Sequence, residues 1–445
     1  MAGTFTGYNK IRPGAYINFR AIQTQNLTIG TRGTVALPMV LPWGAVDAMI
    51  TVTAEDFTSG RTQALLGIGI SNPAIQPLRE AFKGASTVLV YRLNSDAAAA
   101  TGTILNDVTV TAAQGGTFGN SITVSSVANG DAFDFITSVG GVEVDRQTVK
   151  TVGDYVANGY VTLTGTATEA FVAFAGVTLT AGDDGLTEPT ADSYTAFLNA
   201  ASTRVWNVMA VPSTLTELPP VVTTYIKNLR DNVGKKRQAV VYNYPAANYE
   251  GIISVDQGYV TSSGERIEPE VFTAFAAGIS AGAQIYESNT YHLIPDAVDI
   301  INPLTDSEIE DALGKGHMVI SMRQDGGIVI EKDINTLTSF TSDHSYAFSK
   351  NRVIRVLDDI ATQVTEIWEN RFIGKVHNND AGRMMFKSAI NSYLYQLQSA
   401  EAIQNYDSET DLQVIQGPTV EDVIANMWIQ PVDSMEKLYL TVEVS

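Results

Sequence analysis

The sequence of 445 residues contains no cysteine and only four histidines. The lack of cysteine excludes disulfide frameworks and thiolate metal sites, and it fits synthesis in a reducing cytoplasm. There is no apolar run long enough to span a bilayer and no signal-peptide pattern at the start, so we expect no direct insertion into a membrane. Lysine and arginine together number 28 against 48 acidic residues, for a formal net charge of -20. A chain this acidic is not expected to bind nucleic acid.

The usual residue patterns of enzymes are also missing. His292, His317, His344 and His377 do not stand at metal-ligand spacing from one another. No nucleophile elbow, phosphate loop or kinase signature is present, and the run Leu66–Ile70 lacks the third glycine of a dinucleotide-binding loop. We therefore expect no enzymatic activity, no metal site and no cofactor.

What is present is a chain whose composition changes several times. Short buried-strand patterns alternate with helical patterns over residues 25–95 and again over 186–340, which is typical of an α/β sheet covered by helices. Between them, residues 96–185 are rich in Thr, Val, Gly and Ala with closely spaced turn signals, the pattern of an antiparallel β-sandwich or barrel. The sequence thus predicts an α+β or α/β multidomain fold: a discontinuous middle domain of helix-covered mixed sheets, with an inserted β-rich domain at its periphery.

Residues 341–445 form the last predicted domain. Apolar residues recur at helical spacing from Val353 to Trp368, and Asn378–Asp380 supplies a capping signal before a second helical run. The polar face of the first helix carries four candidates for a charged contact surface, with plain solvent exposure as the alternative: Arg352, Arg355, Asp359 and Glu366.

Both ends of the chain show isolated strand patterns, which predict extended β arms. In residues 1–24, Ala15, Ile17 and Phe19 alternate with polar residues and with Tyr16. At the other end, Leu438, Leu440, Val442 and Val444 share one face of a predicted strand, and Tyr439 lies on the opposite face. Each strand could either close its own domain or pair with another copy of the protein, and periodicity does not choose between these two arrangements.

Several stretches taken together resemble the sheath protein of contractile tails, in the branch found in phages and phage-like particles of Gram-positive bacteria, such as defective prophages and R-type bacteriocins. The resemblance spans nearly the whole chain and rests on the order of motifs, none of them catalytic. The matching stretches are Asn9–Phe19, Gly116–Asn120, Gln147–Lys150, Gly234–Gln238, Glu331–Thr338, Lys350–Asp358 and Pro431–Tyr439.

This resemblance implies a structural subunit of a contractile injection system. Such proteins form stacked hexameric rings in a helical sheath around an inner tail tube protein, with baseplate and tail terminator proteins as further partners. The resemblance implies that the terminal arms add strands to the C-terminal domain of neighbouring subunits, that this domain faces the tube, and that contraction drives the tube through a target envelope. It also implies assembly in the host bacterial cytoplasm and a place in a virion or phage-like particle. An extracellular β-rich adhesin or surface-layer protein is the alternative that residues 101–185 suggest.

Overall fold

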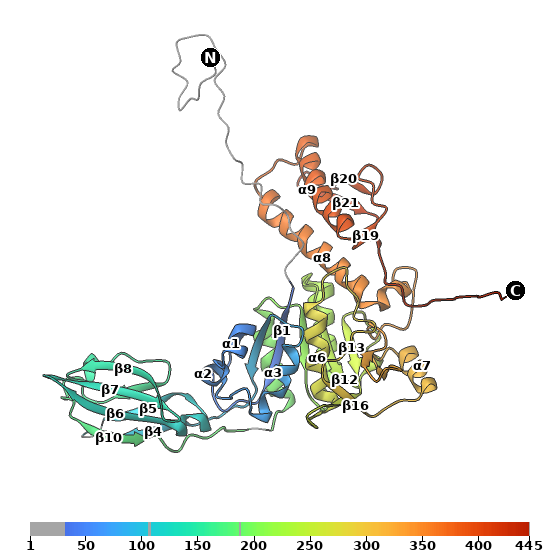
Figure 1. Cartoon of the computed structure of the whole chain (residues 1–445). Helices are drawn as coiled ribbons and strands as arrows, with labels where there is room; N and C mark the ends of the chain where they lie inside the picture. Colours follow the sequence, from blue (N-terminus) through green and yellow to red (C-terminus); the bar gives the residue numbers. More distant parts are fainter. Residues whose placement is uncertain (1–31, 106–107, 187, 445) are drawn as a thin grey trace, which may run out of the picture.

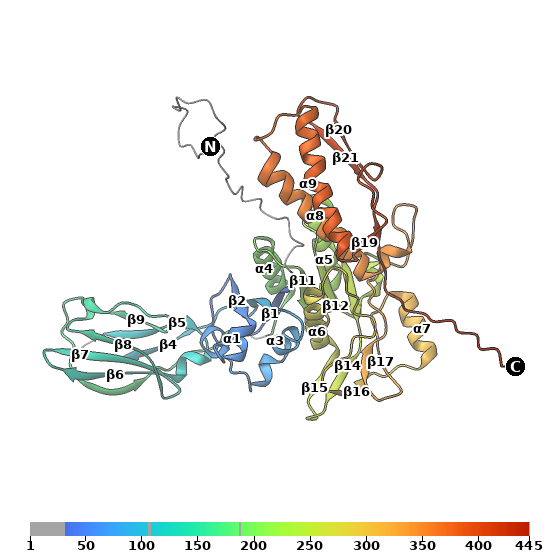
Figure 2. The same ribbon diagram turned by 45° about the horizontal axis from the view of Figure 1, so that its top comes forward.

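The structure is a computed structural model that describes residues 32–105, 108–186 and 188–444. A central α/β body carries a β-sandwich at one end and a helical unit at the other, and the C-terminal tail projects from the body (Figure 1). The turned view shows the same arrangement (Figure 2). The predicted fold class is confirmed. Within the described residues, no helix combines the length and apolar character needed to cross a membrane.

The body is built on a six-stranded sheet with the order β13-β12-β11-β1-β3-β2. All neighbours pair in parallel except β2, which runs antiparallel to β3. Strands buried on both faces read as continuous apolar runs, as residues 35–39 and 239–241 do. Three strands precede the β-rich block and three follow it, so both flanks of that block share one sheet: β1 (Thr34–Met39), β2 (Met49–Thr53), β3 (Thr87–Arg92), β11 (Val208–Val211), β12 (Gln238–Tyr242) and β13 (Ile252–Val255).

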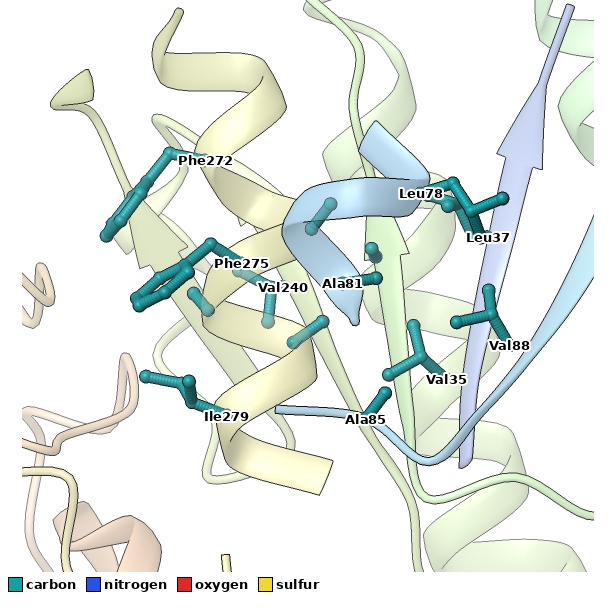
Figure 3. Packing of buried hydrophobic residues seen from close by; sticks show 14 of the residues in the cluster. Val35, Leu37, Leu78, Ala81, Ala85, Val88, Val240, Phe272, Phe275 and Ile279 are labelled. Carbon is teal, nitrogen blue, oxygen red and sulfur yellow. The ribbon is translucent and has the colours of Figure 1, made fainter. Parts of the chain in front are cut away.

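Helices cover both faces of this sheet. Side chains of α3 (Gln76–Ala81) and α6 (Pro269–Gly282) bury one face, where they point into the same cluster as the strand residues (Figure 3). Side chains of α4 (Ala191–Ser202) and α5 (Leu218–Lys227) bury the other. Two glycines let α6 approach its neighbour, because a Cβ on Gly278 would lie 2.2 Å from the Ala81 carbonyl oxygen and one on Gly282 would lie 2.0 Å from that of Gly84.

Smaller elements complete the body. A three-stranded sheet and a two-stranded one follow the main sheet in the chain. Their members, with the remaining helices of the body, are α1 (Ala54–Thr58), α2 (Thr62–Leu66), β14 (Gly258–Thr261), β15 (Arg266–Ile267), β16 (Ala297–Ile301), α7 (Asp306–Lys315), β17 (Ile320–Met322) and β18 (Ile328–Ile330).

The β-rich block is an antiparallel sandwich of two sheets, with orders β4-β5-β9 and β10-β6-β7-β8. A single apolar cluster, which includes Val110, Phe135 and Phe171, forms its core. Strand β4 begins at Ala99, inside the alanine run 97–100, which carries no strand signal, and this strand was not predicted. The strands are β4 (Ala99–Thr103), β5 (Thr109–Gly115), β6 (Ile122–Asn129), β7 (Ala132–Val139), β8 (Val142–Val149), β9 (Val161–Thr164) and β10 (Phe174–Thr178).

The sandwich is joined to the body by packing as well as by two chain crossings. Trp43 of the body is 2% exposed and belongs to the sandwich core, with its ring 5.0 Å from that of Phe118. Arg92 Nη1 donates to the carbonyl oxygens of Gly44 and Gly115, at 3.2 and 2.7 Å. Removing the sandwich would therefore expose Trp43 and leave the Arg92 guanidinium without one of its partners, so the joint is not a passive linker.

The C-terminal unit consists of two long helices with short strands packed against them. Helix α8 (Asn351–Ile367) continues as a π-helical turn to Phe372, and Asn379 caps α9 (Asp380–Ser399) by accepting a hydrogen bond from the Gly382 amide at 2.8 Å. Both predicted helices and the cap are confirmed. An apolar cluster that includes Ile360, Ile367, Ile390 and Leu394 joins them. The strands are β19 (Ile403–Gln404), β20 (Leu412–Gln416), β21 (Val423–Met427) and β22 (Gln430–Pro431).

Candidate assembly surfaces

The C-terminal tail, residues 437–444, lies away from its own domain. Leu438, Leu440, Val442 and Val444 are 86, 74, 71 and 91% exposed, and Tyr439 is 88% exposed. The predicted strand over Lys437–Val444 is absent from the isolated chain, because a β-strand needs a hydrogen-bonding partner and no described segment pairs with this one. The tail therefore does not close its own domain. The predicted arm residues Ala15, Tyr16, Ile17 and Phe19 lie outside the described residues.

The root of the tail, by contrast, is held firmly. Strand β22 pairs with β19, and the Val432 amide donates to the Ala402 carbonyl oxygen at 3.0 Å. The Glu436 carboxylate lies 2.5 Å from the Lys350 ammonium and accepts a hydrogen bond from the Thr290 hydroxyl at 3.2 Å. These contacts of the root end at Glu436, and the exposed apolar segment begins directly after it.

The hairpin of β20 and β21 presents open edges on the same unit. Its two strands pair with each other over five residues, and within the described ranges neither has a second strand partner. The buried side chain of Leu412, with the half-buried Val414 and Val423, packs on the helix pair, whereas Trp428 is 57% exposed. An unpaired edge with apolar residues beside it is a template for an added strand.

A hollow adjoins this hairpin at the junction of α8 and α9. It has a volume of about 430 Å³ and is lined by apolar side chains that include Trp368, Phe372 and Val423, with Arg383 and Glu421 among the polar ones. A space of this size can accept a large side chain from a segment docked on the hairpin.

Charge is strongly segregated around the hairpin. Residues 388–436 contain eight acidic residues and no basic one. Within the described part of the chain, the five acids at 407, 409, 411, 421 and 422 have no cation within ion-pair distance, and three of them are exposed: Asp407, Glu409 and Glu421. The first 31 residues show the opposite balance, with three basic residues, Lys10, Arg12 and Arg20, and no acidic one.

The polar face of α8 is mostly buried, which corrects the expectation of an exposed charged face. Arg352, Arg355 and Asp359 are 7, 1 and 6% exposed, and of the four candidates only Glu366 is exposed. A side chain buried within its own chain has no surface to offer to a tube. This burial could not be predicted from the sequence, because the partners of these side chains come from distant segments of the chain.

Those partners form an ionic cluster between α8 and the body. Arg355 Nη2 lies 2.7 Å from Asp333 Oδ2, and Asn351 Nδ2 donates to Asp333 Oδ1 at 2.9 Å. Burial alone would raise the pKa of the Asp333 carboxyl, but Arg355 and the hydrogen bonds from Asn289 and Asn351 hold that pKa below its ordinary value.

Two further contacts extend the cluster along the helix. Arg230 makes a bidentate pair with Asp358, at 2.7 and 2.8 Å, and the Tyr393 hydroxyl donates to Asp359 at 2.5 Å. Burial and the neighbouring Asp359 raise the pKa of the Tyr393 hydroxyl well above its ordinary value. The first half of α8 is thus fixed to the body by charge, and the second half is fixed to α9 by apolar contacts.

Comparison with known proteins identifies the chain that carries these surfaces. Four family models match in succession: the tail sheath protein Gp18 domain III N-terminal region over residues 32–93, the phage tail sheath protein beta-sandwich domain over 95–184, the phage tail sheath protein central domain over 187–336 and the phage tail sheath C-terminal domain over 343–445. The sheath tail protein of Desulfitobacterium hafniense is 39% identical, with a TM-score of 0.79, and the match covers 96% of this chain and 99% of that one. The chain belongs to the phage tail sheath family.

Other relatives of this sheath protein agree. The sheath tail protein of Listeria innocua is 34% identical with a TM-score of 0.84, and the match covers 94% of this chain and 96% of that one. The phage-like element PBSX protein XkdK of Bacillus subtilis is 35% identical over 100% of this chain and 99% of its own length. The helical sheath of the anti-feeding prophage, solved in a contracted state, is 13% identical with a TM-score of 0.58 and shows the shared fold alone.

The family resemblance drawn from the sequence is therefore confirmed, and the adhesin alternative has no support. The role of the family is structural, and its members are parts of phage or phage-like particles. The residues that organise the described surfaces, Lys350, Glu436 and Asp333, lie inside stretches that carried the resemblance, but their pairing was not readable from the sequence.

Proposed function

We propose that this sheath protein polymerises as stacked hexameric rings around an inner tail tube, and that the polymer contracts to drive the tube through a target cell envelope. Neighbouring subunits are linked by exchange of terminal β-strands. The observation that carries the proposal is the exposed apolar tail at 437–444, on a unit whose hairpin has unpaired edges. Each half of a strand-exchange contact is present on one chain, and neither half has a strand partner among the residues that the structure describes.

The energy available from such a link is substantial. Burying a leucine or valine side chain contributes about 1.5–3 kcal/mol, and the tail offers four of them on one face. Part of this is offset by the cost of ordering the tail and of association. Backbone hydrogen bonds in a strand ladder can persist while rigid domains rotate, so the same links can serve both an extended and a contracted lattice.

Charge favours the N-terminal arm as one of two strand partners for the hairpin. The N-terminal arm, with its three basic residues, complements the acidic stretch at 388–436, whereas the tail from Lys437 onward carries one basic and one acidic side chain. We therefore place the arm of one neighbouring copy along one open edge of the hairpin, with attraction that guides its approach, and the tail of another copy along the other open edge.

The remaining parts of the proposal follow from the same assembly. The division of the chain is an arm at 1–24, a middle domain of 25–95 plus 186–340, a peripheral β domain at 96–185 and a C-terminal domain at 341–445. The C-terminal domain faces the tube, with Glu366 as the exposed candidate for a tube contact. Baseplate and tail terminator proteins cap the polymer, which assembles in the host bacterial cytoplasm.

Electron microscopy of the purified protein tests the proposal, because a sheath protein should form tubes.

We expect tube formation at about 0.1 M salt to weaken at 1 M, where the screening length falls from about 10 to 3 Å. Changing Lys10, Arg12 and Arg20 together to Glu should abolish tubes, and changing them to Gln should only weaken them. A control is Lys315, an exposed basic residue on α7 of the body, whose substitution by Gln should leave the salt response unchanged. Tubes formed equally well by the triple Glu variant would contradict the role of charge.

A further inference from the structure

The N-terminal end of α8 carries an unusual excess of positive charge. Lys350 occupies the capping position with no side-chain cap, Arg352 follows in the first turn, and that turn contains no acidic residue. A helix N-terminus already bears partial positive charge, so a cation there is unfavourable unless an anion is supplied from elsewhere. The Lys350 side chain is only 4% exposed, so water does little to relieve this charge.

The root of the C-terminal tail supplies the missing anions. Glu436 Oε1 lies 2.5 Å from Lys350 Nζ, with the Glu436 side chain 15% exposed, and Asp433 Oδ2 lies 3.6 Å from the same nitrogen. The Thr290 hydroxyl holds the Glu436 carboxylate from the other side, at 3.2 Å. No other acidic residue in the described part of the chain forms an ion pair with Lys350. The positive charge at the start of α8 is therefore neutralised by Asp433 and Glu436, which belong to the segment from which the tail departs.

The contact between Lys350 and Glu436 matters because it lies where the tail turns away from its own domain. Only two residues separate β21 from the start of β22, and the tail then leaves near β19 and runs away from the hairpin in both views (Figures 1 and 2). Eight extended residues reach about 27 Å, so a tail released at its root would be free to turn back. It could then cover the open edge of its own hairpin, and both halves of a link would be lost together.

We infer that Lys350 and Glu436 form an anchor that directs the tail outward and couples it to α8. This inference rests on the proposed strand exchange. Lys350 is followed directly by Asn351, whose side chain is bound to Asp333, and Asp333 is bound to Arg355. A mechanical force on an exchanged tail would therefore be transmitted to the start of α8 and to the buried ionic cluster that joins α8 to the body. Lys350 and Glu436 are positioning residues for the link, and they do not form the link themselves.

The test combines a monomer measurement with a polymer measurement on full-length variants. In Glu436→Gln, hydrogen exchange at the Val432 amide, measured in dilute monomer, should accelerate about tenfold, since the ion pair with the buried Lys350 ammonium is lost at the root. The critical concentration for tube formation should rise by a similar factor. The exchanged pair Lys350→Glu with Glu436→Lys should recover at least part of both effects. Glu310→Gln, an exposed carboxylate on α7 outside the tail and the hairpin, is the control and should change neither.

Each contrary result has a distinct meaning. Unchanged exchange in Glu436→Gln would show that the anchor does not hold the root, and would overturn the inference. Faster exchange with an unchanged critical concentration would show that a held root does not matter for linking, and would also overturn it. A wild-type chain that forms no tubes would contradict the proposed function itself, and the monomer exchange would still decide whether the anchor holds.

Discussion

Removal of Leu438–Ser445 is expected to leave a folded, soluble monomer that no longer forms tubes. The described residues of this segment are highly exposed and pair with no other strand in the isolated chain. Substitutions away from packed features usually change the free energy of unfolding by no more than about 0.5 kcal/mol, and the same should hold for this truncation. Circular dichroism during heating would report the fold, and static light scattering would report assembly.

Two single substitutions sharpen this prediction. Leu440 lies on the apolar face of the tail and Thr441 lies on the opposite face. Leu440→Asp should block assembly, because it would place a charge among buried side chains of the link, whereas Thr441→Asp should be tolerated far better. A truncated chain with a lowered melting temperature would assign the tail to the subunit core. Normal tubes from the truncated chain would show that the link is dispensable.

Replacement of Arg355 by Met is expected to be the most destabilising single change in the C-terminal unit. Removing one member of a buried ion pair costs about 3–5 kcal/mol, because the remaining charge stays buried without its partner. The side chains of Arg355 and Asp333 are 0 and 1% exposed. Scanning calorimetry should show the loss, and Glu366→Gln, on the exposed part of the same helix, should change stability by no more than about 0.5 kcal/mol.

A double variant distinguishes a lost pair from lost packing. Arg355→Met combined with Asp333→Leu removes both charges and should recover much of the stability that the single change costs. If Arg355→Met alone cost less than about 1 kcal/mol, within the range of an exposed pair, the buried cluster would not be what fixes α8 to the body.

Acid should weaken the same cluster. The folded-state pKa of Asp333 lies below its ordinary value of 3.8, so its ionised form contributes stability above that pH. This contribution is lost as the pH falls from about 4 through the folded-state pKa. Stability measured from pH 6 downward should therefore fall less steeply in Asp333→Asn than in the wild type, although the variant starts from a lower value.

The periodicity of apolar residues was sufficient to predict the helices and strands that pack through apolar contacts. The stripe from Val353 to Trp368 predicted α8, and the cap at Asn379 predicted the start of α9. The continuous runs at 35–40 and 87–92 predicted buried strands. In each case burial of one face or of the whole segment is imposed by residue type, so the sequence carries the signal directly.

The ionic cluster could not be predicted in the same way. A charged residue on the polar face of a helix looks the same in a sequence whether it meets water or a buried partner. Asp333 lies 22 residues before Arg355, and Asp358 lies 128 residues after Arg230. Such pairs are set by the tertiary fold, and an exposed polar face was the wrong expectation for three of the four candidates on α8.

The tail illustrates a different limit. Its alternation predicts an apolar face, but a strand needs a second segment to pair with, and no described segment of the isolated chain pairs with this one. The same alternation therefore left open whether the strand closes its own domain. The exposure of 437–444 removes that choice for the single chain, and its partner remains the proposal made above.

Site-specific cross-linking tests most directly the central claim that the tail of one copy pairs with the hairpin of another. Because the chain contains no cysteine, only the introduced cysteines can form disulfides. One variant carries Cys at a tail position, scanned from Leu438 to Val444, and a second variant of different mass carries Gln413→Cys or Asn426→Cys on the hairpin. Paired strands place opposite Cα atoms about 4.5–5.5 Å apart, within the range that a disulfide spans. The account predicts disulfides between the two variants at alternating tail positions, formed only when tubes form. Tubes that assemble without any tail-to-hairpin disulfide, or disulfides confined to one chain in a doubly substituted variant, would contradict it.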